Sequence, residues 1–328
     1  AEDGFRLARA QLRVRAVPQD IAMIAIDDAT LNELGVALPT RHHESQLIDE
    51  LVAAGVHKIV FDRAHADPET PEADAEFART LERHRGKVWL GMAPEQDLGV
   101  QKVDSIVPLR PFRDHAEMAS MVGFSRPFRL SMIFPTEVEF NELQYSSISA
   151  VLAGYEGPPV QYRPDYAFNP KTVPTYRYVD VLQGRIGAAE LAGKNVIIGK
   201  TFIESTDVFI HPLYGKVAGT YFHILGAHTL NRDVPVDLMW FPGLLVAAIA
   251  ICAQAFSRIR VYRYLWLPAA CMGAVTFVLD EIGVNVDIMP GVLAITFAAI
   301  GFYRINRRYY SSDVDAMTTT AISSEKAN

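Results

Sequence analysis

The apolar residues of this chain are concentrated in its C-terminal third, and this uneven distribution constrains the fold more than any other sequence feature. Residues 238–256 contain no charged side chain and, as a helix, are about as long as a bilayer is thick. Two shorter apolar stretches, at 264–279 and 287–303, are near the lower length limit for a membrane span. Three transmembrane helices are therefore expected within residues 237–304, and the alternative is a pair of buried helices in a soluble domain.

The charged residues around the apolar stretches favour membrane insertion. Arginines occupy the first linker and follow the third stretch, whereas the second linker is acidic, with Asp280, Glu281 and Asp287. The arginines are Arg258, Arg260, Arg263, Arg304, Arg307 and Arg308. Because clusters of positive residues mark cytoplasmic loops, the pattern predicts a multi-pass protein with residues 1–236 outside the cytoplasm and the C-terminus inside. An export signal or an anchor ahead of Ala1 is then expected.

Residues 1–236 alternate between short apolar runs and longer amphipathic runs. The apolar runs have the length of strands, and the amphipathic runs carry apolar residues at the spacing of a helix face. The predicted strands are 21–26, 58–61, 87–90 and 194–198, and the predicted helices are 41–54, 74–83, 146–155 and 219–230. This alternation predicts an α/β domain with a mostly parallel sheet and flanking helices.

Acidic residues follow the predicted strands. Asp27 and Asp28 come directly after the first strand, Asp62 after the second, and Asp207 follows the strand at 194–198. Because ligands bind beyond the carboxyl ends of strands in open α/β sheets, these acids predict a site for a cation, an amine or a hydroxylated ligand. The alternative is structural, since Asp28 and Asp62 are also residues that cap helices and hold turns.

Several classes of function are not expected. The formal net charge of −7 argues against a nucleic-acid partner, which needs a basic face. The nine histidines form no HExxH motif and the two cysteines no CxxC motif, so no metal site is predicted. The sequence also lacks GxSxG, a P-loop and GxGxxG, so neither an enzyme activity nor a cofactor is expected. Both cysteines, Cys252 and Cys271, lie in the apolar region, so no disulfide framework holds residues 1–236.

Three segments in this order resemble the CHASE2 family of bacterial extracytoplasmic sensor domains. They are IAMIAIDDATLNELG (21–35), PTRHHESQLIDELVAAGVHKIVFD (39–62) and LAGKNVIIGKTFIESTDVFIHPLYGKVAGTYFHILGAHTL (191–230). The resemblance implies an α/β sensor domain over residues 1–236, followed by three transmembrane helices in the bacterial inner membrane. The chain departs from the family pattern at Arg63-Ala64-His65, where an apolar continuation is usual.

The resemblance also bears on the site and on the output. Asp27, Arg41, Asp62 and Asp207 occupy recurrent polar positions of the family, and with Asp28 they form the predicted ligand-binding set. Such sensors usually carry a cytoplasmic cyclase, kinase or phosphatase domain, whereas here the third stretch is followed by a Ser/Thr-rich segment, 305–328, that is expected to be a disordered tail.

We therefore expect a non-catalytic, membrane-anchored sensor or accessory subunit, in contact with the bilayer, that acts through a membrane protein partner. Two alternatives are a docking subunit of a larger membrane complex and the sensor-and-membrane part of a truncated adenylate or guanylate cyclase or kinase. The small-molecule ligand is not predicted.

Overall fold

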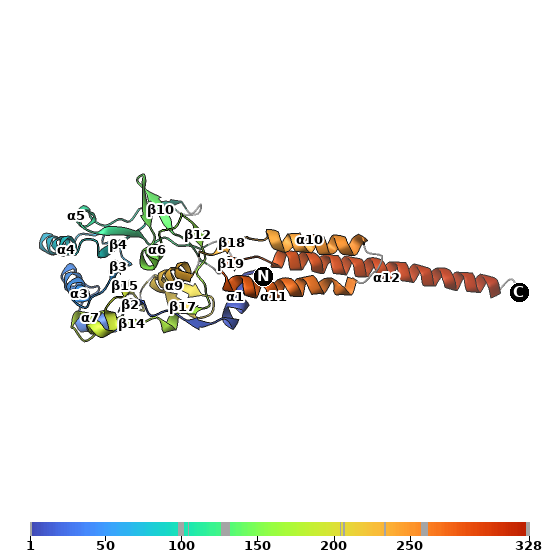
Figure 1. The fold of residues 1–328 in the computed structure, drawn as a ribbon, viewed down its shortest axis with the longest axis horizontal. Helices are drawn as coiled ribbons and strands as arrows, with labels where there is room; N and C mark the ends of the chain where they lie inside the picture. Colours follow the sequence, from blue (N-terminus) through green and yellow to red (C-terminus); the bar gives the residue numbers. More distant parts are fainter. Residues whose placement is uncertain are drawn as a thin grey trace. The chain divides into compact units, whose positions relative to one another are not determined.

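The chain divides into two compact units, which are described separately. The computed structural model describes residues 2–97, 102–103, 105–125, 132–203, 205, 207–232, 234–256 and 262–325. The first unit comprises Asp3–Pro235, and the second comprises Ala1–Glu2 with Val236–Asn328 (Figure 1). The topology residues Arg258 and Arg260 lie outside the described residues.

A six-stranded parallel sheet forms the centre of the first unit, in the order β14-β2-β15-β3-β4-β7. The strands are β14 (Thr175–Arg177), β2 (Ile21–Ile26), β15 (Asn195–Lys200), β3 (Lys58–Phe61), β4 (Val88–Met92) and β7 (Glu117–Ser120). The predicted α/β architecture with a parallel sheet and flanking helices is thus confirmed. Strand β15, which comes late in the sequence, pairs with β2 on one side and β3 on the other.

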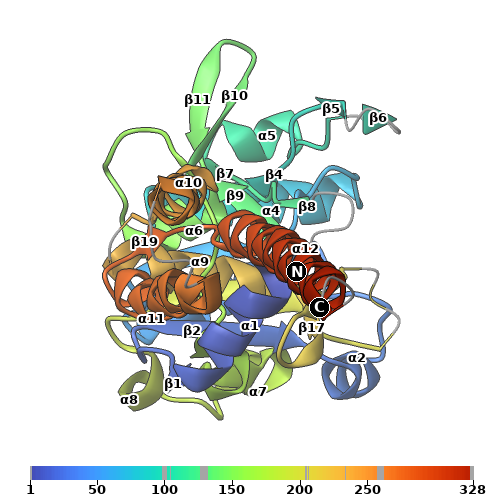
Figure 2. The same cartoon turned by 90° about the vertical axis from the view of Figure 1, so that its right-hand side faces the viewer.

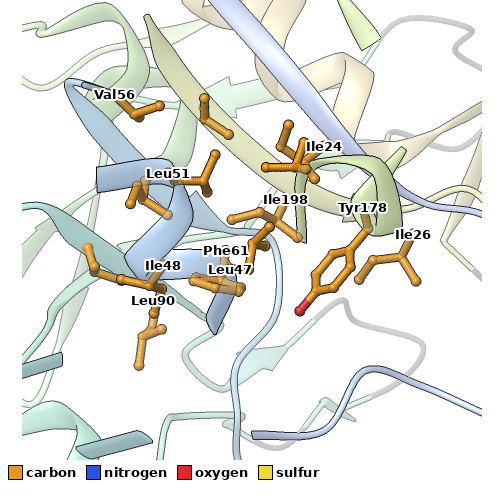
Figure 3. Packing of buried hydrophobic residues seen from close by; sticks show 14 of the residues in the cluster. Ile24, Ile26, Leu47, Ile48, Leu51, Val56, Phe61, Leu90, Tyr178 and Ile198 are labelled. Atoms are coloured by element: carbon orange, nitrogen blue, oxygen red, sulfur yellow. The ribbon is translucent and has the colours of Figure 1, made fainter. Parts of the chain in front are cut away.

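Helices cover both faces of this sheet. One face carries α3 (Arg41–Ala53), α4 (Pro71–Arg83) and α7 (Tyr178–Leu182), and the other carries α6 (Ile148–Ala153) and α9 (Gly219–Arg232). Figure 3 shows Leu47, Ile48 and Leu51 of α3 packed with strand residues such as Ile24 and Ile198. All six residues of β2 are buried, and this two-sided burial explains why the strand is an uninterrupted apolar run.

Local signals set the ends of the helices near the sheet edge. Helix α2 (Asp28–Leu34) begins after Asp27, whose side chain accepts a hydrogen bond from the Thr30 amide, and it ends at Gly35 with φ +67°. Helix α3 begins after Thr40, which forms a capping box with His43. Helix α4 begins after Thr70 with a proline at its first position, three residues earlier than its apolar periodicity predicts.

The rest of the first unit is built of short elements, consistent with its many prolines and glycines. They are α1 (Glu2–Leu12, whose first residue belongs to the second unit), β1 (Arg15–Ala16), β5 (Gln96–Asp97), β6 (Lys102–Val103), α5 (Arg110–Arg113), β8 (Phe124–Ser125), β9 (Met132–Pro135), β10 (Glu137–Phe140), β11 (Leu143–Ser146), β12 (Gln161–Tyr162), β13 (Phe168–Asn169), η1 (Pro170–Thr172), α8 (Ala188–Leu191), β16 (Val208–His211) and β17 (Gly215–Ala218). The hairpin β10–β11 projects from the rest of this unit (Figure 2).

Among its described residues, the second unit contains three α-helices that lie side by side (Figures 1 and 2). They are α10 (Phe241–Phe256), α11 (Trp266–Glu281, preceded by η2, Tyr262–Leu265) and α12 (Met289–Glu325), and β18 (Val236–Asp237) pairs with β19 (Val284–Asn285). Helices α10 and α12 meet backbone to backbone, because a Cβ atom at Gly291 would lie 2.3 Å from the Gly243 carbonyl oxygen.

One helix of the described residues, Met289–Arg307, is long and apolar enough to cross a membrane, with a mean hydropathy of 1.2 over its best window. Helix α10 is apolar but shorter than the length that this criterion requires. The third of the expected spans is therefore identified by length and composition, and the other two are not. Helix α12 also continues to Glu325, through the segment whose composition favours disorder. Extending an existing helix adds one hydrogen bond per residue without a new nucleation step, which explains the difference.

The contact between β15 and α9 gives a test of the packing. A Cβ atom at Gly199 would lie 2.0 Å from Thr220 Oγ1, so Gly199→Ala is expected to lower the free energy of unfolding of the first unit by about 1–3 kcal/mol. Native-state hydrogen exchange of the β15 amides measures this change. The control is Gly4→Ala, whose added methyl meets no atom within 4 Å. Unchanged exchange in Gly199→Ala would contradict the close packing.

Candidate functional site

The carboxyl ends of β2, β3 and β15 lie at one edge of the sheet, because these strands are parallel neighbours. After β2 and β3 the chain continues to α3 and α4, which cover one face of the sheet. After β15 it continues to α9, which covers the opposite face. Such a divergence is where ligands bind in open α/β sheets. The five predicted site residues fall into three groups around it.

Asp27 and Asp28 have structural roles. Asp27 Oδ1 accepts a hydrogen bond from the Thr30 amide at 2.8 Å, and its Oδ2 lies 3.5 Å from Arg177 Nε. Asp28 Oδ2 accepts from the Ile203 amide at 3.1 Å and so holds the segment that follows β15. No hydrogen bond or ion pair between described residues links either acid to Asp62 or Asp207. The structural alternative therefore describes this pair, but the residue that caps α2 is Asp27 rather than Asp28, which is the first residue of the helix.

Arg41 belongs to a buried ionic network and is only 1% exposed. Its guanidinium donates to Glu44 Oε2 at 3.1 Å and to the Asp67 carbonyl oxygen at 2.8 Å, and its Nε lies 3.4 Å from Asp74 Oδ1. The guanidinium also lies over the ring of Phe77, 5.5 Å from its centroid. These contacts join the start of α3 to α4 and to the segment before it.

Glu44 is the centre of this network. Its Oε1 receives hydrogen bonds from Arg63 Nη1 at 2.9 Å and from His65 Nε2 at 3.1 Å. Burial alone would raise the pKa of Glu44, but His65, Arg63 and Arg41 outweigh burial and hold the pKa at about 2. His65 has φ +52°, and its ring stacks on Phe77 with centroids 5.1 Å apart. We conclude that the network fastens α3, α4 and the segment after β3 together.

Sequence reasoning missed Glu44, Arg63 and His65. The departure from the family pattern at Arg63-Ala64-His65 was the available signal, because two polar residues replace an apolar continuation. What it could not reveal is that Arg63 and His65 meet Glu44, about twenty positions earlier in the chain.

Asp62 and Asp207, the acid pair, are the two predicted site residues that interact with each other. Asp62 Oδ2 accepts a hydrogen bond from Thr220 Oγ1 at 2.7 Å, and its Oδ1 lies 3.7 Å from His223 Nε2. The Asp207 carboxylate lies against Gly219, the first residue of α9, where a Cβ atom would be 2.3 Å from Oδ1. The acid pair therefore joins the sheet edge to the N-terminus of α9.

The surroundings of the acid pair favour a proton or another positive partner. Burial and the neighbouring Asp62 raise the pKa of Asp207 to about 6, against the opposing effect of Lys200. Burial lowers the pKa of His223, and Asp62 opposes this. Among the described residues, no group of three or more His, Cys, Asp or Glu side chains is arranged to hold a metal ion. Glu204, between β15 and Asp207, lies outside the described residues.

The helix α9 residues at this site, Thr220 and His223, were not predicted from the sequence. The segment Gly219-Thr220-Tyr221-Phe222-His223 carries a signal for a helix start but none for a contact with Asp62. That contact arises only because β15 lies beside β3 and directs α9 over the neighbouring strand ends.

The ionic network predicts a strong dependence of stability on Glu44. Glu44→Gln should lower the free energy of unfolding by about 3–5 kcal/mol at pH 7, because it leaves buried arginine charge without its partner. Since the folded pKa of Glu44 is about 2 against an ordinary 4.5, its contribution is present above pH 4.5 and is lost as the pH falls toward 2. Circular dichroism melts over this pH range measure both effects.

The control is Glu50→Gln, an exposed acid on the same helix, which should change stability by less than about 0.5 kcal/mol. Equal melting temperatures for the two variants at pH 7 would show that the Glu44 network does not hold the helices.

Comparison with known families agrees with these features. The sequence model of the CHASE2 domain matches residues 3–256, which is more than half of the chain. The match includes the whole first unit, with the acid pair and the ionic network, and extends through α10. No curated protein and no solved structure matches the chain. The chain belongs to the CHASE2 domain family, whose members are extracytoplasmic sensor domains.

Proposed function

We propose that this protein is a membrane-anchored sensor or accessory subunit that has no catalytic activity of its own and acts through a partner protein. The observation that carries the proposal is the order of its parts. The first unit, which lies within the CHASE2 match, precedes a three-helix unit with a predominantly apolar exterior. Such a unit suits a membrane anchor, and the sensor domain would then face the extracytoplasmic side of a bacterial inner membrane.

The surface of the second unit supports three spans. Phe256 on α10 is 89% exposed, Val278 on α11 is 65% exposed, and Phe297 on α12 is 70% exposed. A soluble bundle would turn such side chains inward, whereas lipid tails favour them outside. Exposed aromatic residues near the ends of the apolar stretches fit the interfacial belts of membrane proteins, and they include Trp240, Trp266, Tyr264 and Tyr303.

The proposed topology follows the charges. The acidic segment between α11 and α12, with Asp280 and Glu281, would lie outside. The arginines between α10 and α11 and near Arg304 would lie inside. This arrangement would place residues 1–236 outside, in agreement with the known location of CHASE2 domains.

The signal would pass to another protein through the three-helix unit. The close approach of α10 and α12 at Gly243 and Gly291 supports a tightly packed anchor that offers its outer faces to lipid or to the helices of a partner. The sensor-and-membrane part of a cyclase or kinase is the alternative in which the output belongs to the same polypeptide.

A docking subunit of a larger membrane complex is the second candidate. The observation in its favour is an exposed apolar surface after β15 and on the hairpin β16–β17. It comprises Ile203, Val208, Phe209 and Ile210. Exposed apolar residues of this kind are common where another protein binds.

Cysteine labelling tests the topology. In a variant with Cys252 and Cys271 replaced by serine, Glu281→Cys should react with a membrane-impermeant maleimide added outside spheroplasts, because the second linker is proposed to lie outside. Arg304→Cys should react only after the membrane is permeabilised. The reverse pattern of reactivity would place the sensor domain in the cytoplasm and contradict the proposal.

Purification in mild detergent tests the partner. We expect native mass spectrometry of the gently solubilised chain to show a second, different membrane protein in stoichiometric amount, because the helices of the second unit are proposed to bind a partner. A tagged, unrelated inner-membrane protein of similar abundance is the control. Isolation of this chain only as a monomer or homodimer would count against an accessory subunit.

A further inference from the structure

We propose that Asp207, beside Asp62 at the start of α9, binds a proton that sets the position of the N-terminus of this helix according to the pH outside the cell. The inference deepens the sensor role and rests on the proposed function for its direction, since the pair would report on the extracytoplasmic side. It concerns regulation by a proton at a site whose geometry is described above.

The two acids hold adjacent residues of one helix. Asp62 accepts a hydrogen bond from Thr220 Oγ1 at 2.7 Å, and the Asp207 carbonyl oxygen accepts from the Gly219 amide at 3.0 Å. When both carboxylates are ionised they repel each other at the start of α9, where Asp62 binds Thr220 and the Asp207 carboxylate lies against Gly219. Protonation of Asp207 removes this repulsion.

The charged groups around Asp207 come from three elements. Asp62, after β3, disfavours its ionised form, and Lys200, at the end of β15, favours it. His223, on α9, faces Asp62. Burial is the larger cause, and together with Asp62 it raises the pKa of Asp207 to about 6. Within the described residues the Asp207 carboxylate accepts no hydrogen bond, which leaves it available for a proton.

His223 is a second, independent sign that this cluster handles a proton. Its side chain is about nine-tenths buried, and its Nε2 points at Asp62 Oδ1 from 3.7 Å, which is too far for a hydrogen bond. Its Nδ1 is buried and has no hydrogen-bond partner among the described residues. A buried imidazole directed at a carboxylate pair without a bond to it is poised to form one when the protonation of the pair changes.

Helix α9 provides the route for the signal. It runs from Gly219 at the acid pair to Arg232, and the second unit begins at Val236. Its buried residues, among them Ile224 and Leu225, pack in the core on this face of the sheet. A displacement at the start of this helix would therefore be carried along a packed element to the segment that enters the second unit.

Hydrogen exchange of the full chain in phosphatidylcholine nanodiscs tests the proposal, with labelling times corrected for the intrinsic exchange rate at each pH. The peptide covering residues 215–225 should be protected at pH 5 and should exchange about tenfold faster or more at pH 7.5, with a midpoint near 6. The sign follows from the raised pKa, since the folded state gains stability from the proton at low pH and loses it as the pH rises through 6.

Variants assign the transition to the acid pair. Asp207→Asn should stay protected at both pH values. Asp62→Asn, which removes the neighbouring charge, should move the midpoint to lower pH. Asp114→Asn, an exposed acid on the same unit, should keep the wild-type transition. These exchange measurements depend on neither a partner protein nor the membrane topology. A negative result would therefore reject the proton switch without rejecting the proposed sensor or accessory role, which the labelling and purification experiments test.

Two results would overturn the proposal. One is an absence of any pH transition in this peptide of the wild-type chain. The other is a transition that persists in a folded Asp207→Asn chain, because a group other than Asp207 would then be titrating. If adding His223→Gln to that chain abolishes the transition, the titrating group is the histidine.

Discussion

The pairing of β15 with both β2 and β3 is the interaction on which the rest of the structure depends. It places β15, from residues 195–200, between two strands from the first 61 residues and thereby joins them into one parallel sheet. It also brings Asp207 to Asp62 and directs α9 over the face of the sheet opposite to α3. Gly199 allows α9 to pack closely on β15, because Thr220 of α9 occupies the space that a Cβ atom at position 199 would need.

Two arrangements of buried charged groups lie near the edge of the sheet. The network of Arg41, Glu44, Arg63 and His65 is closed, since buried groups of both signs meet there and fix the helices in one arrangement. The acid pair is unbalanced, since two carboxylates share a partly buried place near a single lysine. A balanced network resists changes in pH around neutrality, whereas an unbalanced pair responds to them.

Much of the fold could be predicted from local patterns in the sequence. Four strands of the sheet and helices α3, α4 and α9 follow from apolar runs and helical spacing, because both depend on burial of neighbouring residues. The ligand-binding role of the predicted residues stays a prediction. Asp62 and Asp207 do interact, but Asp27 and Asp28 serve as a cap and as an acceptor for a loop amide, since a carboxylate after a strand suits either role. Partners distant in sequence, such as Glu44 with His65 or Asp62 with Thr220, depend on strand order, which local patterns do not encode.

We propose that the CHASE2 sensor domain lies outside the cytoplasm and that the helices after it anchor it in the membrane. Protease treatment of spheroplasts that carry the chain with a C-terminal epitope tag tests this topology. We expect protease added outside to remove the first unit and to leave a tagged fragment of about the size of residues 236–328. Protection of the full-length chain in spheroplasts, with digestion of the first unit only in inverted membrane vesicles, would contradict it.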